Sequence, residues 1–332
     1  MPGCPVCSGD DFVTIASAER LELECRIREQ FVAARLTRPA NPDELKDLTD
    51  FFHTGKADVL GCRGCTLLVR RKHEQPPAQD YSQDEYDPRV MERLYPKYLD
   101  AFRKKANPYR ALLPAQARVL EVGSHYGAFL ETAAEWGWRA EGVDPGKDTS
   151  RFARSKGFTV HQIAIEECEF PPDTFDGVFI WNCFEQIEDP KSTLEICRRI
   201  LKPGGLFTVR TPNGRFYSDC QQLLRDAEVQ DEAREFLQRA MGYNNLLGFP
   251  YQYGHNPATL ERLISAYGFR CQDFLNSELL VFPLPEDPAW VKREERAINS
   301  EIRLLANSNL ADGTGTFTGP WVEVWFRAAD AP

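Results

Sequence analysis

The chain has 332 residues, long enough for one large domain or two ordinary ones, and 42% of them are hydrophobic, which is enough for a real core. Its 40 basic and 50 acidic side chains give a formal net charge of −10, which argues against a general nucleic-acid binder, although a local basic patch stays possible. With no apolar run of membrane-spanning length and no apolar signal core at the N-terminus, we expect a soluble cytoplasmic protein.

Two C-x-x-C pairs bracket the first part of the chain, Cys4 and Cys7 in CPVC and Cys62 and Cys65 in CRGC. Each pair presents two thiolates from one tight turn, and two pairs supply the four ligands of a tetrahedral zinc site. Zinc-ribbon pairs are commonly about 15–20 residues apart, whereas 54 residues intervene here, so the insert must loop out. A redox pair or coincidence is the alternative. We predict one structural Zn²⁺ with no open position for chemistry.

The insert and the segment after the second pair have simpler signals. Apolar residues from Leu23 to Val32 (Leu23, Ile27, Phe31, Val32) recur at helical spacing, which predicts a helix between the pairs. The stretch EQPPAQD at 74–80 predicts a boundary, because prolines end regular structure. Residues 81–113 begin with YSQDEY and predict a helical lead-in rich in tyrosine.

From residue 117 onward, predicted strands alternate with predicted helices, which implies a mainly parallel sheet covered on both faces. The strands are 117–123, 139–144, 158–164, 175–182 and 205–212, and the helices are 127–136, 148–156 and 190–201. Lys202-Pro203-Gly204-Gly205 is expected to end the last helix and turn into the next strand. A helical insert at about 215–247, helix 257–267, strand 269–275, helix 288–305 and a final strand 321–328 follow.

The first of these strands runs into the glycine turn EVGSHYG, from Glu121 to Gly127. A dinucleotide-binding turn, G-x-G-x-x-G, uses its middle glycine to let a pyrophosphate touch the backbone. Counting from Gly123, that middle place holds His125, so a nicotinamide dehydrogenase is the least favoured enzyme. Asp144 ends the second strand, where an acid can accept hydrogen bonds from ribose hydroxyls. The turn therefore suits a ligand with a ribose and no phosphate.

Taken in order, these motifs resemble the class I S-adenosylmethionine (SAM) dependent methyltransferases over roughly residues 110–330. EVGSHYG is similar to the family's first motif, E/D-x-G-x-G-x-G, with His125 replacing the middle glycine, and GVDPG resembles the second. FDGVFIWNCFEQIEDP with RRILKPGGLFTVRTPN is similar to the fourth-strand, helix and fifth-strand block, and GHNPATLERLISAYGF resembles the segment after it. The resemblance implies an α/β fold with a Rossmann-like, seven-stranded, mostly parallel sheet whose last strand is antiparallel.

The resemblance also implies which residues hold SAM: Glu121, Gly123, His125, Tyr126, Gly127, Asp144, Ile165, Glu166 and Asn182. Asp144 would bind the ribose, Ile165 and Glu166 would enclose adenine, Asn182 would line the pocket, and His125 with Tyr126 would wall the methionine end. Simpler roles stay open. The two glycines can serve only close packing, Asp144 can cap the following helix, and Glu166 can be a solvated surface acid.

Methyl transfer from a sulfonium is an in-line displacement that depends mostly on orientation, with a base needed only where the acceptor must lose a proton. Many related enzymes carry Glu-His where this chain has Glu185-Gln186, and glutamine cannot act as a base at neutral pH. His255 is our first choice for this base, because imidazole titrates near neutral pH, and Glu185, His125 and the lead-in tyrosines are the other candidates. For His255, a capping or core-edge role is the alternative.

A zinc ribbon before such a domain, followed by YSQDEY, partly resembles the sugar C-methyltransferases of natural-product pathways, although the long insert departs from them. We expect a zinc-binding module at 1–73, a lead-in or lid at 81–113, and a methyltransferase domain at 114–332 with a substrate-cap insert at 215–250. The expected acceptor is a small molecule, such as a sugar nucleotide or natural-product intermediate. The alternatives are a protein or RNA methyltransferase docked by the zinc module, which the module's nearly even charge disfavours, and a non-catalytic SAM-binding scaffold.

Overall fold

The computed structural model describes residues 3–39, 56–74, 87–105, 109–284, 286, 288–311 and 319–329, and for 306–311 it describes the backbone alone. The chain divides into two compact units. The first comprises Met1–Pro77, Pro212–Leu260 and Leu275–Val322, and the second comprises Ala78–Thr211, Glu261–Phe274 and Glu323–Pro332. The YSQDEY segment lies outside the described residues. Among the helices that are described, none is both long and apolar enough to cross a membrane.

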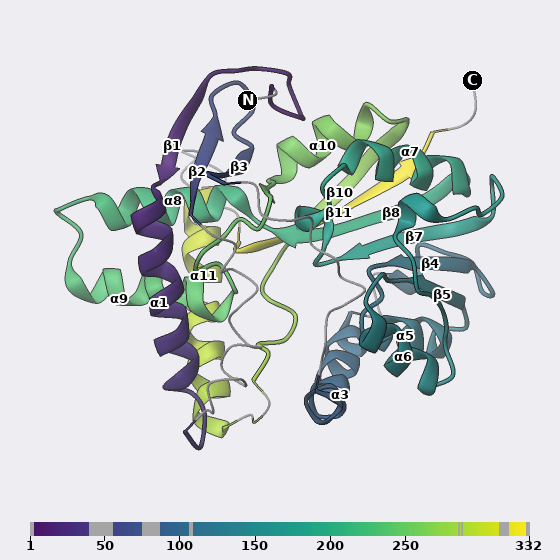
Figure 1. Ribbon diagram of the computed structural model, residues 1–332, viewed down its shortest axis with the longest axis horizontal. Helices are drawn as coiled ribbons and strands as arrows, with labels where there is room; N and C mark the ends of the chain where they lie inside the picture. Colours follow the sequence, from purple (N-terminus) through teal and green to yellow (C-terminus); the bar gives the residue numbers. More distant parts are fainter. Residues whose placement is uncertain are drawn as a thin grey trace. The chain divides into compact units, whose positions relative to one another are not determined.

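A seven-stranded sheet of order β10-β11-β8-β7-β4-β5-β6 dominates the second unit (Figure 1). Its strands are β4 (Arg118–Val122), β5 (Arg139–Val143), β6 (Thr159–His161), β7 (Phe175–Trp181), β8 (Leu201–Pro212), β10 (Phe269–Ser277) and β11 (Trp321–Ala328). The pairs β4–β5, β4–β7, β5–β6 and β7–β8 are all parallel. This confirms the predicted seven-stranded, mostly parallel sheet.

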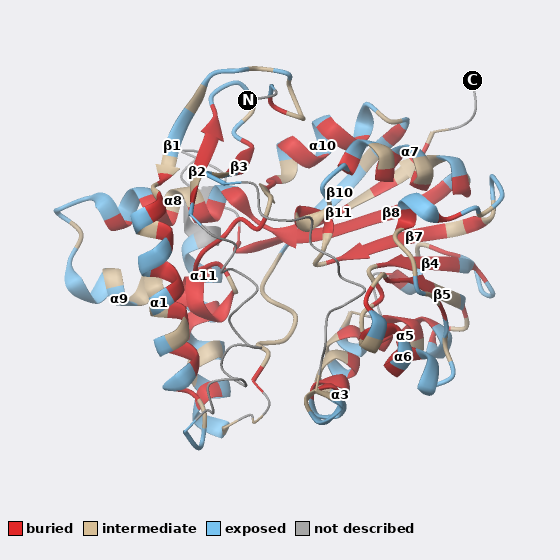
Figure 2. Cartoon of the chain, viewed as in Figure 1, coloured by how far each residue is buried: buried red, intermediate tan, exposed pale blue. Residues whose placement is uncertain are grey.

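Helices cover both faces of this sheet (Figure 1). The helices α3 (Pro88–Lys104), α5 (Ala128–Glu135) and α6 (Lys147–Ser155) lie on one face, and α7 (Pro190–Ile200) lies on the other. Strands β4 and β7 are buried along almost their whole length (Figure 2), because neither face meets water. The chain runs from β4 outward to β6 and then returns to β7, so the strand order reverses between β4 and β7. Open α/β sheets bind ligands beyond the carboxyl ends of the strands at such a point.

The predicted turn after α7 lies inside a strand. Helix α7 ends at Ile200 and β8 begins at once with Leu201. Leu201 pairs with Phe175 and Leu206 pairs with Gly177. Between these two pairs β8 moves on by five residues, whereas β7 moves on by two. Lys202-Pro203-Gly204-Gly205 therefore loops out of the ladder as a bulge, with Gly204 at φ 69°. The turn chemistry was predicted, but its place within paired strands was not.

The first unit contains an antiparallel four-stranded sheet of order β1-β2-β3-β9, which the sequence did not predict. Its strands are β1 (Phe12–Ala16), β2 (Ala57–Cys62), β3 (Leu68–Lys72) and β9 (Tyr253–Gly254), and the helices of the unit are α1 (Ala18–Ala33), α8 (Gly214–Arg225), α9 (Asp231–Tyr243), the start of α10 (Pro257–Ser265) and α11 (Ala289–Ala311). A single apolar core joins β1–β3 to α1, α8, α9 and α11. Segments distant in sequence thus share one core.

Helix α1 confirms the predicted helix between the cysteine pairs and buries Phe31 and Val32 of the predicted apolar set, but it also buries a charged residue. Leu23 is 39% exposed, whereas Glu24 is fully buried. The Glu24 carboxylate accepts hydrogen bonds from the Tyr217 hydroxyl at 3.1 Å, the Gly248 N–H at 2.9 Å and the Gln221 side-chain amide. A carboxylate that gains this many donors can be buried, since its lost hydration is replaced. The periodicity of the apolar residues alone could not indicate that Glu24 is buried.

Candidate functional site

The glycine turn lies at the carboxyl end of β4, where the strand order reverses. Gly123 has φ 72°, and a Cβ there would come within 2.6 Å of the Cys183 Sγ, which follows β7. Gly127 has φ 76° and precedes α5, and its Cβ would lie 3.0 Å from the Ala153 Cβ. Both positions therefore need glycine for conformation and for close approach. Close packing therefore accounts for both glycines. The approach of Gly123 to Cys183 also brings the loops after β4 and β7 together.

His125 occupies the middle place of the turn with φ 46°. This left-handed conformation is the one that glycine adopts most easily, and among other residues His, Asn and Asp are enriched in it. The backbone N–H of His125 donates a 2.7 Å hydrogen bond to Asp144 Oδ2. Burial lowers the pKa of the His125 imidazole to about 4, so its ring is neutral near pH 7.

Asp144 follows β5 and is buried by the turn it holds together. Besides the His125 N–H, its Oδ1 accepts from the Gly146 N–H and from the Thr149 hydroxyl, both at 2.9 Å. The carboxylate therefore ties the glycine turn to the start of α6. An ionised carboxylate has about four acceptor positions, so these three bonds leave one for a ligand hydroxyl. The N-cap of α6 is Gly146 and not Asp144 as suggested, but the Asp144 carboxylate binds the N–H of that cap residue, and this leaves room for a ligand-binding role.

Glu121 ends β4 beneath the turn and is 3% exposed. Burial, with the nearby charge of Asp144, raises the pKa of its carboxyl well above the ordinary value. Among the described residues, none hydrogen-bonds to Glu121 Oε2. A buried oxygen of this kind ordinarily has a partner. A donor on a bound cofactor would supply one, which is the fit expected of a SAM site.

Aromatic side chains cover the turn from α3. The rings of His125 and Tyr126 lie with centroids 3.6 Å apart, and Tyr98 of α3 approaches them edge-on at 6.2 and 5.9 Å. The predicted lead-in helix is therefore packed on the glycine turn within the second unit. These side chains form a wall at the place where a phosphate-binding turn would expose bare backbone.

Ile165 and Glu166 follow β6 in a single 3-10 turn, η3 (Ile165–Glu167). Ile165 is buried, and its contact with adenine stays a prediction. Glu166 is exposed, and its Oε1 accepts a 2.5 Å hydrogen bond from the Thr193 hydroxyl of α7. The structure thus connects Glu166 to α7, and its contact with adenine stays a prediction.

Asn182 follows β7 with φ 59° and faces the neighbouring strand β8. Its backbone N–H donates to the Arg210 carbonyl at 2.9 Å, and its side-chain Oδ1 accepts a hydrogen bond from Arg210 Nη1. Arg210 is fully buried. The side chain predicted to line the cofactor pocket is therefore held by a buried cation.

Glu185 lies in the short 3-10 helix η4 (Phe184–Gln186), directly after the same strand end. Its carboxyl is buried, and Oε2 accepts a 3.2 Å hydrogen bond from the Thr211 hydroxyl. Burial raises the pKa of Glu185 to about 7, with the Thr211 hydrogen bond and the charge of Arg210 acting in the opposite direction. A carboxyl that titrates near neutral pH can accept a proton under working conditions.

His255, the other catalytic candidate, belongs to the first unit. It follows β9, is 1% exposed, and its backbone carbonyl accepts a 2.6 Å hydrogen bond from the Gly214 N–H. Burial lowers the pKa of its imidazole to about 3. The ring is neutral at pH 7 but is a weak proton acceptor, which favours Glu185 as the base.

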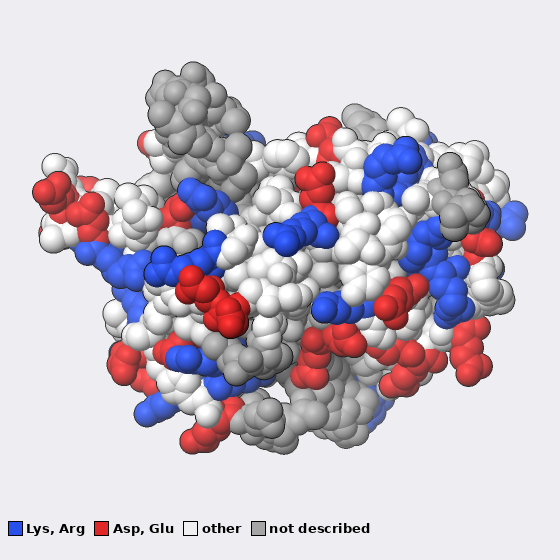
Figure 3. Space-filling model, turned by 90° about the horizontal axis from the view of Figure 1, so that it is seen from above, with Lys and Arg blue, Asp and Glu red and all other residues white. Residues whose placement is uncertain are grey.

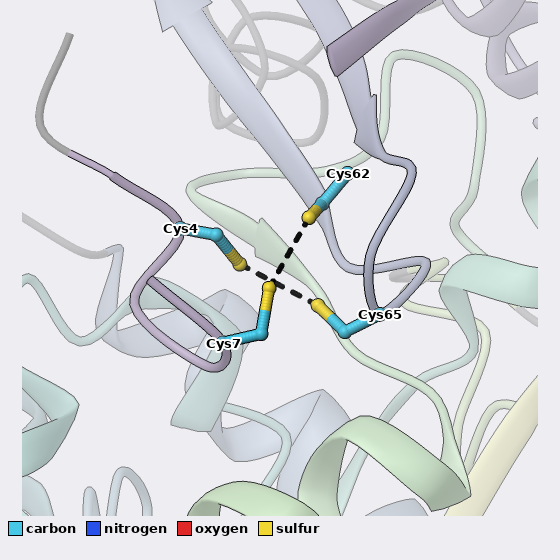
Figure 4. Close-up of side chains that lie close together, drawn as sticks. All are labelled: Cys4, Cys7, Cys62 and Cys65. Carbon is cyan, nitrogen blue, oxygen red and sulfur yellow. Dashed lines mark hydrogen bonds between the residues drawn. The ribbon is translucent and has the colours of Figure 1, made fainter. Parts of the chain in front are cut away.

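The four cysteines of the two pairs meet in the first unit (Figure 4). Their sulfurs all lie within 4.8 Å of one another, with Cys4–Cys65 and Cys7–Cys62 each 3.5 Å apart. Sulfurs at about 2.3 Å from one zinc ion are about 3.8 Å apart in a tetrahedron. The separations are far longer than the about 2.05 Å of a disulfide bond. The residues present therefore fit a metal site of the predicted kind.

The two pairs form nearly identical turns. The Ser8 N–H donates to the Cys4 carbonyl and the Thr66 N–H donates to the Cys62 carbonyl, both at 2.8 Å. Ser8 has φ 60° and Thr66 has φ 65°, so each turn ends in a left-handed residue. The long insert does not separate the turns, because β1 and β2 pair with Phe12 opposite Cys62.

The second cysteine turn also contacts the segment that carries His255. Strand β3 pairs with β9, with Leu68 opposite Gly254 and Val69 opposite Tyr253. The Asn256 side-chain amide donates a 3.0 Å hydrogen bond to the Thr66 hydroxyl, directly after Cys65. The cysteine cluster is thus structurally continuous with residues 253–256.

Several residues of these sites escaped the sequence analysis: Tyr98, Lys105, Tyr109, Thr149, Arg210, Thr211 and Glu323. One of them left a signal, since Glu323 interrupts the otherwise apolar strand WVEVWF. A charge within a buried strand needs a partner. On the face drawn in Figure 3, basic and acidic side chains are interspersed.

Comparison with known proteins agrees with this geometry. A family model described as a methyltransferase domain matches residues 84–273 of the chain. A ubiquinone biosynthesis O-methyltransferase from Alkalilimnicola ehrlichii is 28% identical over 145 residues, 36% of this chain and 59% of the relative. One from Vibrio cholerae is 34% identical over 95 residues, 26% of this chain and 39% of the relative. The matches span less than two thirds of either relative.

Two of the solved structures that the chain resembles are named as methyltransferases. A putative S-adenosylmethionine dependent methyltransferase from Listeria monocytogenes aligns with a TM-score of 0.45 and 17% identity, covering 70% of this chain and 100% of that chain. One from Mesorhizobium loti aligns with a TM-score of 0.46 and 19% identity, covering 69% and 99%.

Proposed function

Since the chain belongs to the class I SAM-dependent methyltransferases, we propose that it transfers a methyl group from SAM to a small-molecule acceptor. The names of the curated relatives, ubiquinone biosynthesis O-methyltransferases, favour an oxygen acceptor. A sugar nucleotide or a natural-product intermediate is the narrower acceptor class suggested by the cysteine module before the catalytic domain.

One observation carries the proposal. Three features lie together around the strand-order reversal between β4 and β7. They are a positive-φ glycine turn, the buried acid Asp144, which accepts hydrogen bonds from two backbone N–H groups and a hydroxyl, and the buried Glu121 Oε2, which has no partner among the described residues. Ribose hydroxyls and an ammonium group are the donors that such acceptors bind. SAM has both, and when bound it supplies an electrophilic methyl group.

The chain's own residues then orient the acceptor and remove its proton. A hydroxyl acceptor must lose a proton as its oxygen is methylated, and general-base assistance is typically worth about 10²–10⁴ in rate. Glu185 is our first choice for this base, because burial places its pKa at about 7. Tyr98, His125 and Tyr126 would exclude water from the methionine end of the cofactor.

Binding of the cofactor tests the proposal without knowledge of the acceptor. Calorimetric titration of the purified chain with SAM, and with S-adenosylhomocysteine, should give one site per chain. NAD⁺ is the matched control, because it offers a ribose together with the pyrophosphate that the turn cannot accommodate. Binding of NAD⁺ without binding of SAM would refute the assignment. Release of S-adenosylhomocysteine from a panel of phenols and sugar nucleotides then defines the acceptor.

We further propose that Cys4, Cys7, Cys62 and Cys65 hold one structural zinc ion. With all four positions occupied by thiolates, the ion has no open site for catalysis. Its role is to join the two turns and, through β3, to support β9 and Asn256. Metal analysis of protein purified without added metal should find about one zinc per chain. Metal-free, folded protein with four titratable thiols at these positions would contradict this.

A further inference from the structure

A network of buried charges links two strands of the second unit, β8 and β11, behind the proposed base. Arg210 of β8 and Glu323 of β11 form an ion pair with 3.3 Å between Nε and Oε1, and both side chains are fully shielded from solvent. Lys105, after α3, donates to the same carboxylate, and the Tyr109 hydroxyl donates to its other oxygen at 2.6 Å. Tyr109 in turn accepts a 2.8 Å bond from the Trp325 indole.

Such a network is costly unless it is well satisfied, because each ion loses its hydration. Burial alone would raise the pKa of Glu323, but the charges of Lys105 and Arg210 hold it below its ordinary value, so the carboxyl is ionised. Two cations then face one anion. The network by itself carries an excess positive charge in the interior.

Glu185 lies where this excess charge acts. Thr211, whose hydroxyl binds the Glu185 carboxylate at 3.2 Å, directly follows Arg210 in β8. Arg210 and Glu185 attract each other, and the nearby Cys183 thiol stays neutral because burial raises its pKa. With Glu185 ionised, the four groups Lys105, Arg210, Glu185 and Glu323 sum to zero charge. With Glu185 protonated, they sum to one positive charge.

The geometry points to a role in the reaction for Arg210, which no part of the family comparison assigns. We propose that Arg210, held in place by Glu323 and Lys105, is a positioning residue that fixes the Asn182 side chain and stabilises the ionised form of Glu185. Arg210 touches neither acceptor nor cofactor in this proposal, so it acts through these two residues. The inference rests on the proposed methyl transfer only where it assigns Glu185 as the base.

The proton and charge balance of the step is simple. A lone pair on the acceptor oxygen forms the new C–O bond while the C–S bond of the sulfonium breaks, and the acceptor's proton moves to the Glu185 carboxylate. The sulfonium becomes a neutral thioether as Glu185 becomes neutral. Before the transfer, the positive charges of Arg210 and Lys105 are balanced by ionised Glu185 and Glu323. After Glu185 takes the proton, one positive charge is left unbalanced, so Arg210 favours the ionised form of the base.

Two variants change the network charge in opposite directions and provide the test. Glu323→Gln removes the anion that offsets Arg210, so Glu185 should titrate at lower pH. Lys105→Gln removes a cation, so Glu185 should titrate at higher pH. A neighbouring charge typically shifts a titration by about 1–3 pH units at contact, so we expect about one unit or less from Lys105, which acts at a longer range. Arg210→Gln should give the largest upward shift.

The readout is the ¹³C chemical shift of the Glu185 carboxyl carbon across pH 5–9, assigned by its loss in Glu185→Gln. It requires no acceptor, so it separates this inference from the proposed function. Lys202→Gln is the matched control. Lys202 lies on the same strand as Arg210, but it pairs with Asp176 of β7, so its removal should leave the Glu185 titration unchanged. If Arg210→Gln does not fold, the two milder variants still decide the outcome.

Opposite shifts for Glu323→Gln and Lys105→Gln support the inference, and shifts of the same sign, or none, overturn it. With an acceptor in hand, the acidic limb of kcat/KM should move with the carboxyl titration while SAM affinity stays within about twofold. If the Glu185 titration shifts in these variants but the acidic limb of kcat/KM does not move, Glu185 and Arg210 have no role in the mechanism. Failure of the wild type to bind SAM would refute the proposed function and leave the titration result standing.

Discussion

The glycine turn of the second unit and the cysteine cluster of the first are both built from short loops, but they are organised differently. Each cysteine turn is complete within five residues, and the same hydrogen bond recurs in both. The glycine turn depends on side chains from three other places: Asp144 after β5, Cys183 after β7 and Tyr98 in α3. The cysteine cluster is assembled from two local turns, whereas the proposed cofactor site is assembled by strand order.

The largest expected effect is at the cysteine cluster. Cys62→Ser should abolish stoichiometric zinc, because three thiolates remain and zinc binding is worth on the order of 10 kcal/mol in small structural sites. Metal analysis and thermal unfolding measure the change, with protection of residues 253–256 from hydrogen exchange as the structural readout. Cys271→Ser, at a cysteine outside the cluster, is the matched control. Full zinc retention in Cys62→Ser would contradict a four-cysteine site.

The second effect concerns the base. Glu185→Gln should lower kcat by about 10²–10⁴, and wild-type activity should rise with pH through about 7, because the ionised carboxylate is the active form. His255→Ala should cost less, since a histidine with a pKa of about 3 is a poor proton acceptor. A larger loss in His255→Ala than in Glu185→Gln would reverse this assignment.

The raised pKa of Glu185 also predicts a pH-dependent stability. The folded state keeps the proton up to about pH 7, whereas the unfolded chain releases it near pH 4.5, so wild-type stability falls as pH rises between these values. Glu185→Gln removes this loss, and its unfolding free energy should change less over the same window. Denaturant unfolding at pH 5 and pH 8 measures the difference.

The third effect separates two roles of Asp144. Asp144→Ala should weaken SAM binding by about 1.5–3 kcal/mol, the scale for a lost hydrogen bond to a charged group. It should also destabilise the protein, because three internal hydrogen bonds are lost. Thr149→Val removes only one of those internal bonds, so it should lower stability by about 1 kcal/mol with little change in SAM affinity. Equal losses of SAM affinity in the two variants would mean that Asp144 serves the turn alone.

The smallest effect tests the contact between the cysteine turn and the segment of His255. Asn256 caps α10, with its Oδ1 accepting from the Thr259 N–H and the Thr259 hydroxyl accepting from the Asn256 N–H. Asn256→Ser keeps a capping oxygen but is too short to reach Thr66, so it should cost about 0.5–1.5 kcal/mol of stability. Asn256→Ala should cost about 1 kcal/mol more. If Ser and Ala behave alike, the cap contributes little, and any loss that both variants share comes from the link to Thr66.

Much of the fold followed from local patterns in the sequence. Alternating strands and helices from residue 117 onward predicted the parallel sheet, and the structure places β4 to β8 within a few residues of the expected ranges. The four strands of the first unit were not predicted. Strand β9 has two residues and pairs with a strand more than 180 positions earlier, so no local pattern signals it.

What the sequence determined by itself is therefore the chemistry of its turns: two C-x-x-C loops, a glycine turn with His125 at its centre, and an acid at the end of the second strand. These depend on residues within a few positions of one another, where φ preferences and hydrogen-bonding side chains act directly. Tertiary structure alone decided that Glu24 faces a core, that Glu185 is buried beside Arg210, and that Arg210 meets Glu323. Glu323 reaches Arg210 across 113 positions because β11 lies next to β8. Buried charges take their partners from strand order, and strand order is a property of the whole chain.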